Sequence, residues 1–113
     1  MTQITIRNAP GTWTIRAGGA ILGESKKALG LVEGSYSEII YFPREDVAMA
    51  FLDSTDKSTH CPHKGDASYF SIVTKSKTLE NAAWSYEHPL DGVAEIKDHI
   101  AFYATDDVTI EQI

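Results

Sequence analysis

The sequence predicts a mainly β domain of short antiparallel strands, arranged in two packed sheets or one bent sheet, with one short helix near residues 44–52. Two observations lead to this class. Short runs rich in β-branched and aromatic residues recur between turn-forming residues. Only one segment has the apolar spacing of an amphipathic helix. A length of 113 residues fits a single domain, residues 1–113, with one core.

The N-terminal part of the chain predicts a hairpin followed by a third strand. Apolar and polar residues alternate at residues 4–6 and again at 13–15, on either side of a turn-forming segment at 8–11. A glycine pair then precedes the third strand, expected at residues 20–22. Residues 25–34 fit either a short helix or a loop, because glycines interrupt the segment.

A strand and the one helix are expected in the middle of the chain. Residues 38–42 are rich in β-branched and aromatic side chains, and Pro43 ends this strand. Residues 44–52 are good helix formers, with acidic residues in the first turn where the helix dipole favours them. The polar segment 53–56 is expected to end the helix.

The C-terminal half predicts further strands. Two strands are expected at residues 67–74 and 82–87, joined by a polar turn, and another at 99–103. The C-terminal tail is expected to be partly exposed, with Val108 and Ile110 able to pair as an edge strand. Many short strands and one short helix together favour a sandwich or a bent sheet.

Charge and cysteine content limit the classes of partner and compartment. The net charge is −6 and no Lys or Arg cluster is present, so we expect no nucleic acid or anionic membrane as a partner. Cys61 is the single cysteine, which excludes an internal disulfide and suits a reducing compartment. The first residues lack a signal-peptide pattern, so a cytoplasmic location is expected.

Five residues have side chains that zinc prefers, and several are close in sequence. They are His60, Cys61, His63, His88 and His99. Structural zinc sites usually pair their ligands at fixed spacing, and a single cysteine does not supply such a pair. We therefore expect no metal and no cofactor, and keep a zinc-binding β domain as the third alternative.

Cys61 is also a candidate nucleophile, because His60, His63 and Lys64 are its neighbours in sequence. Neighbours along an extended segment point in different directions, and an inert, buried cysteine is the commoner fate. No hydrolase or metalloprotease motif is present. The sequence therefore leaves open whether the protein is an enzyme, and it identifies no catalytic residue.

A lysine followed by a glycine, Lys64-Gly65, and several aromatic residues suggest a binding cleft. Glycine lets the backbone turn, which can direct the lysine ammonium into a cleft. Trp84 and Tyr86 share one face of a predicted strand. An aromatic-walled pocket with one cation favours a small anionic ligand, although a solvated loop lysine and core aromatics are the alternative.

Many positions of the chain, in order, match a family pattern that covers residues 18–103. They are Ala20, Ser25, Leu29, Glu33, Tyr41, Phe42, Pro43, Asp46, Val47, Leu52, Thr59, Cys61, Pro62, Lys64, Gly65, Ala67, Tyr69, Trp84, Ser85, Tyr86, Pro89, Ile96, Ala101, Phe102 and Tyr103. The pattern resembles the family called domain of unknown function number 427. Its specific centre is the string from Thr59 to Tyr69.

The resemblance implies a small, bacterial-type, cytoplasmic, mainly β domain, loosely similar to β-tent folds. Members of the family sometimes carry a nucleotidyltransferase label, but no transferase metal site is visible in this sequence. Some β-tent folds bind zinc through cysteine pairs, which this chain lacks. His63 stands where the family commonly has an aromatic residue, which lowers its value as a metal ligand.

The resemblance also implies one cleft formed by the matched polar and aromatic positions. The residues expected to bind the ligand are Tyr41, Asp46, Thr59, Lys64, Tyr69, Trp84 and Tyr86. In this hypothesis Lys64 is the charged anchor, the Trp84 and Tyr86 rings are walls, and Asp46 and Thr59 orient the ligand. Three further residues are expected to shape the loop: Cys61, Pro62 and Gly65.

Two functions therefore rank ahead of the zinc alternative. The first is a binding or enzymatic domain for a small anionic molecule, with its site around Lys64. The second is a non-catalytic interaction module that acts as a homo-oligomer, such as a homodimer. It depends on the lack of a catalytic constellation and on edge strands that could pair with a second chain.

Overall fold

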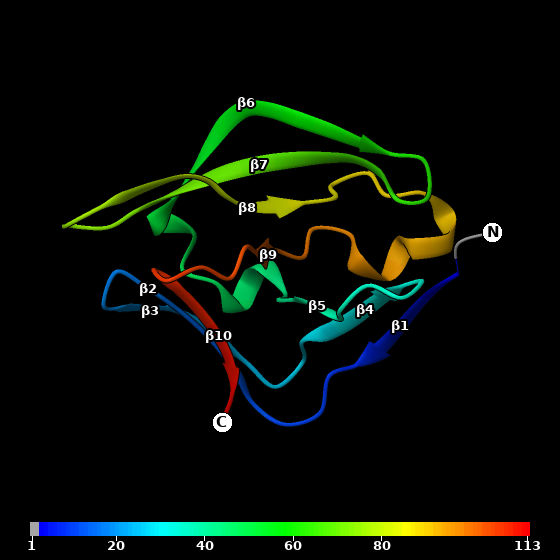
Figure 1. The fold of residues 1–113 in the computed structure, drawn as a ribbon, viewed down its shortest axis with the longest axis horizontal. Helices are drawn as coiled ribbons and strands as arrows, with labels where there is room; N and C mark the ends of the chain where they lie inside the picture. Colours follow the sequence, from blue (N-terminus) through cyan, green and yellow to red (C-terminus); the bar gives the residue numbers. More distant parts are fainter. Residues whose placement is uncertain (1–2) are drawn as a thin grey trace.

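Ten strands form three small antiparallel sheets in the computed structural model, which describes residues 3–113. The predicted mainly β domain of short antiparallel strands is confirmed. The strands are divided among three sheets, where the sequence predicted two packed sheets or one bent sheet. The four-stranded sheet forms one layer, and the two three-stranded sheets lie beneath its two ends (Figure 1).

Each three-stranded sheet joins two consecutive strands to one that is distant in sequence, whereas the four-stranded sheet consists of consecutive strands. The first has the order β1 (Ile4–Asn8), β4 (Leu29–Glu33), β5 (Ile39–Tyr41). The second has the order β10 (Val108–Gln112), β2 (Trp13–Ala17), β3 (Ala20–Ser25). The third has the order β6 (Leu52–Cys61), β7 (Gly65–Val73), β8 (Thr78–Ser85), β9 (Ala101–Phe102). The expected edge strand around Val108 and Ile110 is confirmed as β10.

The predicted N-terminal hairpin is wrong, because β1 and β2 belong to different sheets. β1 pairs with β4, and β2 pairs with β3 and β10. Ala9 is buried, and its N–H donates to the Ala28 carbonyl, so the segment between the strands is held against the chain just before β4 and leads on to another sheet instead of turning back. The hairpin that does form joins β2 to β3 through Gly18 and Gly19, which both have positive φ.

The predicted short helix at residues 44–52 is present as two 3-10 turns, η1 (Arg44–Asp46) and η2 (Met49–Phe51). Between them, Val47 forms a β-bridge with Gly23, and the Ala48 N–H donates to the Leu22 carbonyl at 2.6 Å. Bonds to β3 therefore replace the helical i→i−4 bonds. Residues 53–56, which were expected to end the helix, follow the second 3-10 turn and lie in β6.

The core has two clusters, which use opposite faces of β7 and β8. We call the first the Phe42 cluster; it contains Ile15, Leu22, Phe42, Phe70, Ile72, Ala83, Ile100 and Phe102, among others. We call the second the Trp84 cluster; it contains Leu31, Tyr41, Ala67, Tyr69, Trp84, Tyr86, Val93, Ile96 and Ala101. Tyr69 and Trp84, which are register partners, therefore face the layer formed by β4 and β5.

Among residues 3–113, helical structure is limited to short 3-10 segments, of which η3 (Asp91–Ile96) is the longest. Within residues 3–113, no helix has the length and apolar character that a membrane crossing requires.

Candidate functional site

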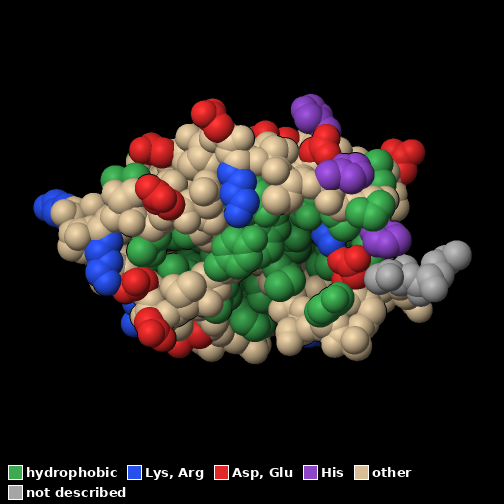
Figure 2. Space-filling view, turned by 45° about the horizontal axis from the view of Figure 1, so that its top comes forward, with side chains coloured by type: hydrophobic (Ala, Val, Ile, Leu, Met, Phe, Trp, Pro, Cys, Tyr) green, Lys and Arg blue, Asp and Glu red, His purple; other side chains and the backbone are tan. Residues whose placement is uncertain are grey.

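A cavity of about 480 Å³ lies between the layers, with β4, β5 and their connecting turn on one side and β7 and β8 on the other. Eight of its eleven lining residues carry an aromatic ring or a charge. The full lining is Leu31, Glu33, Tyr36, Ser37, Ile39, Tyr41, Lys64, Tyr69, Trp84, Tyr86 and Tyr103. Figure 2 shows hydrophobic side chains gathered in a hollow across the middle of this face.

Five of the seven residues expected to bind a ligand line this cavity: Tyr41, Lys64, Tyr69, Trp84 and Tyr86. β5 contributes Tyr41, and the β6–β7 turn contributes Lys64. β7 and β8 supply Tyr69 and Trp84, which are cross-strand partners. Tyr86 follows β8 on the same face of the sheet. The structure therefore brings the predicted cation and the predicted aromatic walls together.

The other two expected residues lie elsewhere. Thr59 is exposed on β6 and does not line the cavity. Its Oγ1 lies 3.0 Å from the hydroxyl of Tyr69, which does line it. Asp46 lies in η1, outside the cavity lining, and accepts a hydrogen bond from Ser25 Oγ at 2.6 Å. Its carboxylate therefore holds η1 against β3, and we leave it out of the candidate site.

The loop expected to present Lys64 is a tight turn between β6 and β7. The Lys64 N–H donates to the Cys61 carbonyl at 3.1 Å, and the Lys64 carbonyl accepts from the Leu90 N–H at 3.0 Å. Gly65 has a φ of 111°, which side chains rarely adopt, and a Cβ there would lie 3.3 Å from the His88 carbonyl oxygen. Backbone bonds on both sides therefore fix the turn and direct the Lys64 side chain inward.

Lys64 forms an ion pair with Glu33, a partner that the sequence did not suggest. Their side chains are only 11% and 19% exposed, and the Lys64 ammonium also lies 5.9 Å from the centre of the Tyr86 ring. Burial by itself lowers the pKa of Lys64, but the hydrogen bond to Glu33, together with the nearby Cys61 side chain, outweighs it and raises the pKa above its ordinary value. The cation is therefore stably protonated inside the cavity.

Three tyrosine hydroxyls in the cavity also stay protonated. Burial raises the pKa of Tyr41 and Tyr86, and burial together with the Tyr69 hydroxyl raises the pKa of Tyr103 to about 12. The Tyr41 oxygen accepts a hydrogen bond from Trp84 Nε1 at 3.3 Å, which leaves its own proton free to donate. The Tyr86 hydroxyl makes no hydrogen bond with residues 3–113, so it can also donate into the cavity.

The aromatic rings form walls at several angles. The Trp84 ring meets the Tyr41 ring edge to face, with centroids 6.4 Å apart, and lies 4.5 Å from the Tyr103 ring. Tyr36, on the β4–β5 turn, is 77% exposed at the rim. A flat or apolar ligand group would contact several ring faces and edges at once.

A second lysine lies beside the site. Lys57 Nζ is 4.7 Å from the centre of the Tyr69 ring, a cation–π distance. Lys57 forms no ion pair with any residue in the range 3–113, whereas Lys64 is paired with Glu33. One cation at the edge of the aromatic wall is therefore not balanced by a carboxylate.

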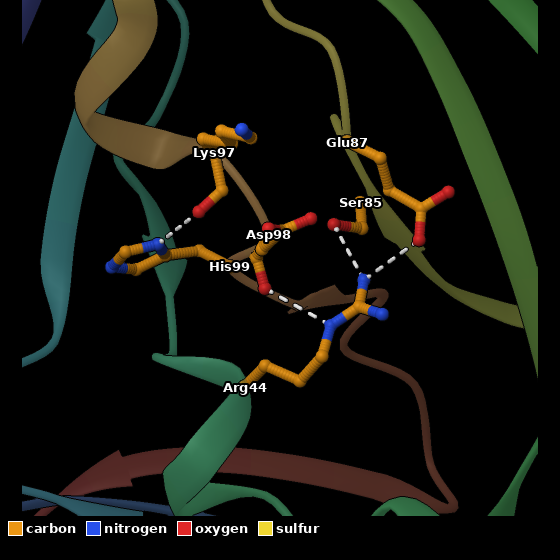
Figure 3. A network of polar contacts seen from close by, with 6 residues as sticks. All are labelled: Arg44, Ser85, Glu87, Lys97, Asp98 and His99. Atoms are coloured by element: carbon orange, nitrogen blue, oxygen red, sulfur yellow. Dashed lines mark hydrogen bonds and ion pairs between the residues drawn. The ribbon is translucent and has the colours of Figure 1, made fainter.

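On the opposite face of β8, Arg44 fixes the position of the strand that carries the aromatic wall (Figure 3). Its guanidinium donates to Ser85 Oγ at 3.2 Å, to Glu87 Oε2 at 3.1 Å and to the Asp98 carbonyl at 3.2 Å. It also lies 5.6 Å from the centre of the Phe70 ring. These contacts hold the end of β8, between Trp84 and Tyr86, against η1 and the segment after η3.

The zinc alternative gains no support from the arrangement of histidines. His60 Nδ1 lies 2.7 Å from Asp66 Oδ1 in an exposed pair, and His63 and His88 are exposed. Throughout residues 3–113, no three His, Cys, Asp or Glu side chains gather in a way that could hold a metal ion. Cys61 is half-buried and free.

Six residues that line the cavity were not among the predicted site residues: Leu31, Glu33, Tyr36, Ser37, Ile39 and Tyr103. Period-two spacing was the available signal, because Leu31 and Glu33 share one face of β4 and Ile39 shares a face with Tyr41. The sequence does not indicate that β4 and β5 lie opposite β7 and β8.

The chain was also compared with known proteins. A family model described as Domain of unknown function (DUF427) matches residues 5–112. No curated protein is significantly similar to the chain.

Proposed function

We propose that this chain, which belongs to the family described as Domain of unknown function (DUF427), binds a small organic molecule through an anionic group that contacts Lys64. The observation that carries the proposal is a protonated ammonium, 11% exposed, inside an aromatic cavity of about 480 Å³. Cavities of this size that combine apolar walls with a few convergent polar groups are typical of small-molecule sites.

The polar groups of the cavity suit an oxyanion. The ammonium has three N–H donors, and Glu33 accepts from one of them. The Tyr41 and Tyr86 hydroxyls are further donors, and their raised pKa keeps them protonated at neutral pH. A carboxylate or a phosphate oxygen would therefore meet one charged donor and neutral donors in a partly dry environment, where such hydrogen bonds are strong.

Glu33 has two opposing effects on an anionic ligand. It holds the Lys64 side chain in position, which reduces the entropy lost on binding, but its own negative charge repels the ligand. Lys57, which lies over Tyr69 without an ion pair among residues 3–113, offsets part of this repulsion. Glu33→Gln is therefore expected to tighten the binding of a monoanion, whereas a zwitterionic ligand with its ammonium on Glu33 would bind more weakly to the same variant.

A matched pair of probes tests the proposal. Benzoate and benzamide have the same flat body and differ in charge, so calorimetric titration of both isolates the contribution of the anion. We expect benzoate to bind at least about tenfold more tightly, which corresponds to about 1.4 kcal/mol. Lys64→Gln should abolish the difference, and Lys26→Gln, which removes an exposed lysine outside the cavity, should leave it unchanged.

Folding of the Lys64 variant must be checked, because Glu33 loses its partner. The double variant Glu33→Gln/Lys64→Gln removes both charges and leaves no unpaired carboxylate in the cavity. It should fold and should bind benzoate and benzamide equally. Equal binding of the two probes by the unmodified protein would contradict the proposal.

A further inference from the structure

We infer that the ligand is elongated and amphipathic, with its anionic head at Lys64 and an uncharged apolar body that passes Trp84 and Tyr103 into a second cavity. The inference rests on the proposed function, because it takes the head group at Lys64 from it. It adds the class of ligand: a carboxylate or phosphate ester with a linear or flat hydrocarbon portion.

The second cavity adjoins the first. It has a volume of about 430 Å³ and shares four lining residues with the first cavity: Ser37, Ile39, Trp84 and Tyr103. These four residues therefore mark the boundary at which the two cavities meet. Figure 2 shows that hydrophobic side chains gather across the middle of this face, as expected for two adjoining apolar cavities.

The chemistry changes along this groove. The first cavity contains Lys64 and Glu33, whereas the second is lined mainly by apolar side chains, including those of Trp13, Ile40 and Phe102. Its one charged lining residue, Glu38, already accepts two hydrogen bonds from the Arg7 guanidinium, at 2.7 and 2.8 Å. No charged group of the second cavity is thus free for a ligand, and an uncharged, apolar group fits it.

The two rings at the junction suit an apolar chain or a flat group. Trp84 and Tyr103 lie 4.5 Å apart, centre to centre, with their planes tilted by 43°. Tyr103 is 44% exposed, so a ligand can cover part of its ring without displacing any protein contact. Each methylene placed against these rings adds apolar burial, which is the largest favourable term for such a ligand.

A series of straight-chain carboxylates tests the length of the ligand. Dissociation constants of butanoate, hexanoate and octanoate are measured by calorimetric titration of the full chain. If the chain continues into the second cavity, each methylene should tighten binding about three- to fourfold, and octanoate should bind about a hundredfold more tightly than butanoate. Ala104→Phe fills part of the second cavity from an exposed position, so folding should be unaffected.

In Ala104→Phe, octanoate should lose most of its advantage while butanoate binds as before. Ala50→Phe places the same bulk at an exposed position outside both cavities and should change neither constant. Equal affinities across the series, with butanoate still dependent on Lys64, would overturn the inference and leave the proposed function standing. Failure of all three to bind would count against both. A dimer that Ala104→Phe dissociates would also overturn the inference, because a second copy would then occupy the groove.

Discussion

At the scale of single residues, the candidate site depends on two opposite charges held in one aromatic cavity. Lys64 and Glu33 are 31 positions apart and mostly buried. Removing one partner leaves the other without compensation, so Lys64→Gln and Glu33→Gln should each lower the free energy of unfolding by about 1–3 kcal/mol. The double variant should lose less than the two single variants together. Urea unfolding of the four proteins measures this coupling, and additive single effects would contradict it.

The tyrosine hydroxyls limit the stability of the folded protein at alkaline pH. The folded pKa of Tyr41, Tyr86 and Tyr103 is raised above the ordinary value of 10.0, to about 12 for Tyr103, and that of Lys64 is also raised. The folded state therefore binds these protons more tightly than the unfolded state. The stability they contribute is fully present below about pH 10 and is lost as the pH rises through the folded pKa values.

Urea unfolding at a series of pH values from neutral to above 10 should accordingly show a steep fall at the alkaline end. Tyr103→Phe removes one of the groups that must stay protonated, so its free energy of unfolding should fall less steeply in that range. Tyr36→Phe is a matched control, because Tyr36 is 77% exposed at the rim. An identical alkaline slope for Tyr103→Phe and the unmodified protein would contradict this expectation.

Sequence reasoning identified the cation and most of the aromatic walls but not the counter-ion. Lys64 and Trp84 stand in a specific family pattern, and their residue types indicate a cavity by themselves. Glu33 also fits that pattern, yet nothing local in the sequence indicates that β4 faces the β6–β7 turn. Ion pairs between distant segments depend on sheet packing, which residue types do not specify.

At the scale of elements, the β6–β7 turn sets where the Lys64 side chain points. Gly65 has a φ of 111° and lies close to the His88 carbonyl. Gly65→Ala should therefore lower the free energy of unfolding by about 1–3 kcal/mol and weaken benzoate binding, because the turn must shift. Gly92→Ala is the control, since a Cβ there meets nothing within 4 Å and its φ is not positive. Equal effects of the two substitutions, by urea unfolding and calorimetry, would contradict a special role for this turn.

The elements that the sequence missed or misassigned share one cause, which is that their hydrogen-bond partners lie in other segments. β6 has mostly polar, exposed residues and pairs only with β7, so it lacks the alternation that marks a half-buried strand. The bridge of Val47 to Gly23 similarly breaks the predicted helix into two turns. Strands with strong local signals, such as β5 and β7, lie where the sequence predicted them.

At the scale of the whole molecule, the four-stranded sheet joins two core clusters because it buries both faces. Adjacent residues of β7, Tyr69 and Phe70, belong to the Trp84 cluster and the Phe42 cluster respectively. Trp84 and Ala83 are divided in the same way on β8. Neither cluster can lose its packing while these strands stay in place, so the groove between the layers persists only as long as the whole domain is folded.

The two tryptophans allow this cooperativity to be measured. Trp13 packs against the Phe42 cluster and Trp84 belongs to the other, so Trp84→Phe and Trp13→Phe each leave one fluorescent reporter in one cluster. In each variant, urea unfolding followed by fluorescence should coincide with unfolding followed by circular dichroism. Adding Phe42→Ala, which empties a fully buried position, should lower the free energy of unfolding by about 3–5 kcal/mol for both reporters. A Trp84 transition that stays in place while the Trp13 transition moves would mean that the site layer unfolds independently of the Phe42 cluster.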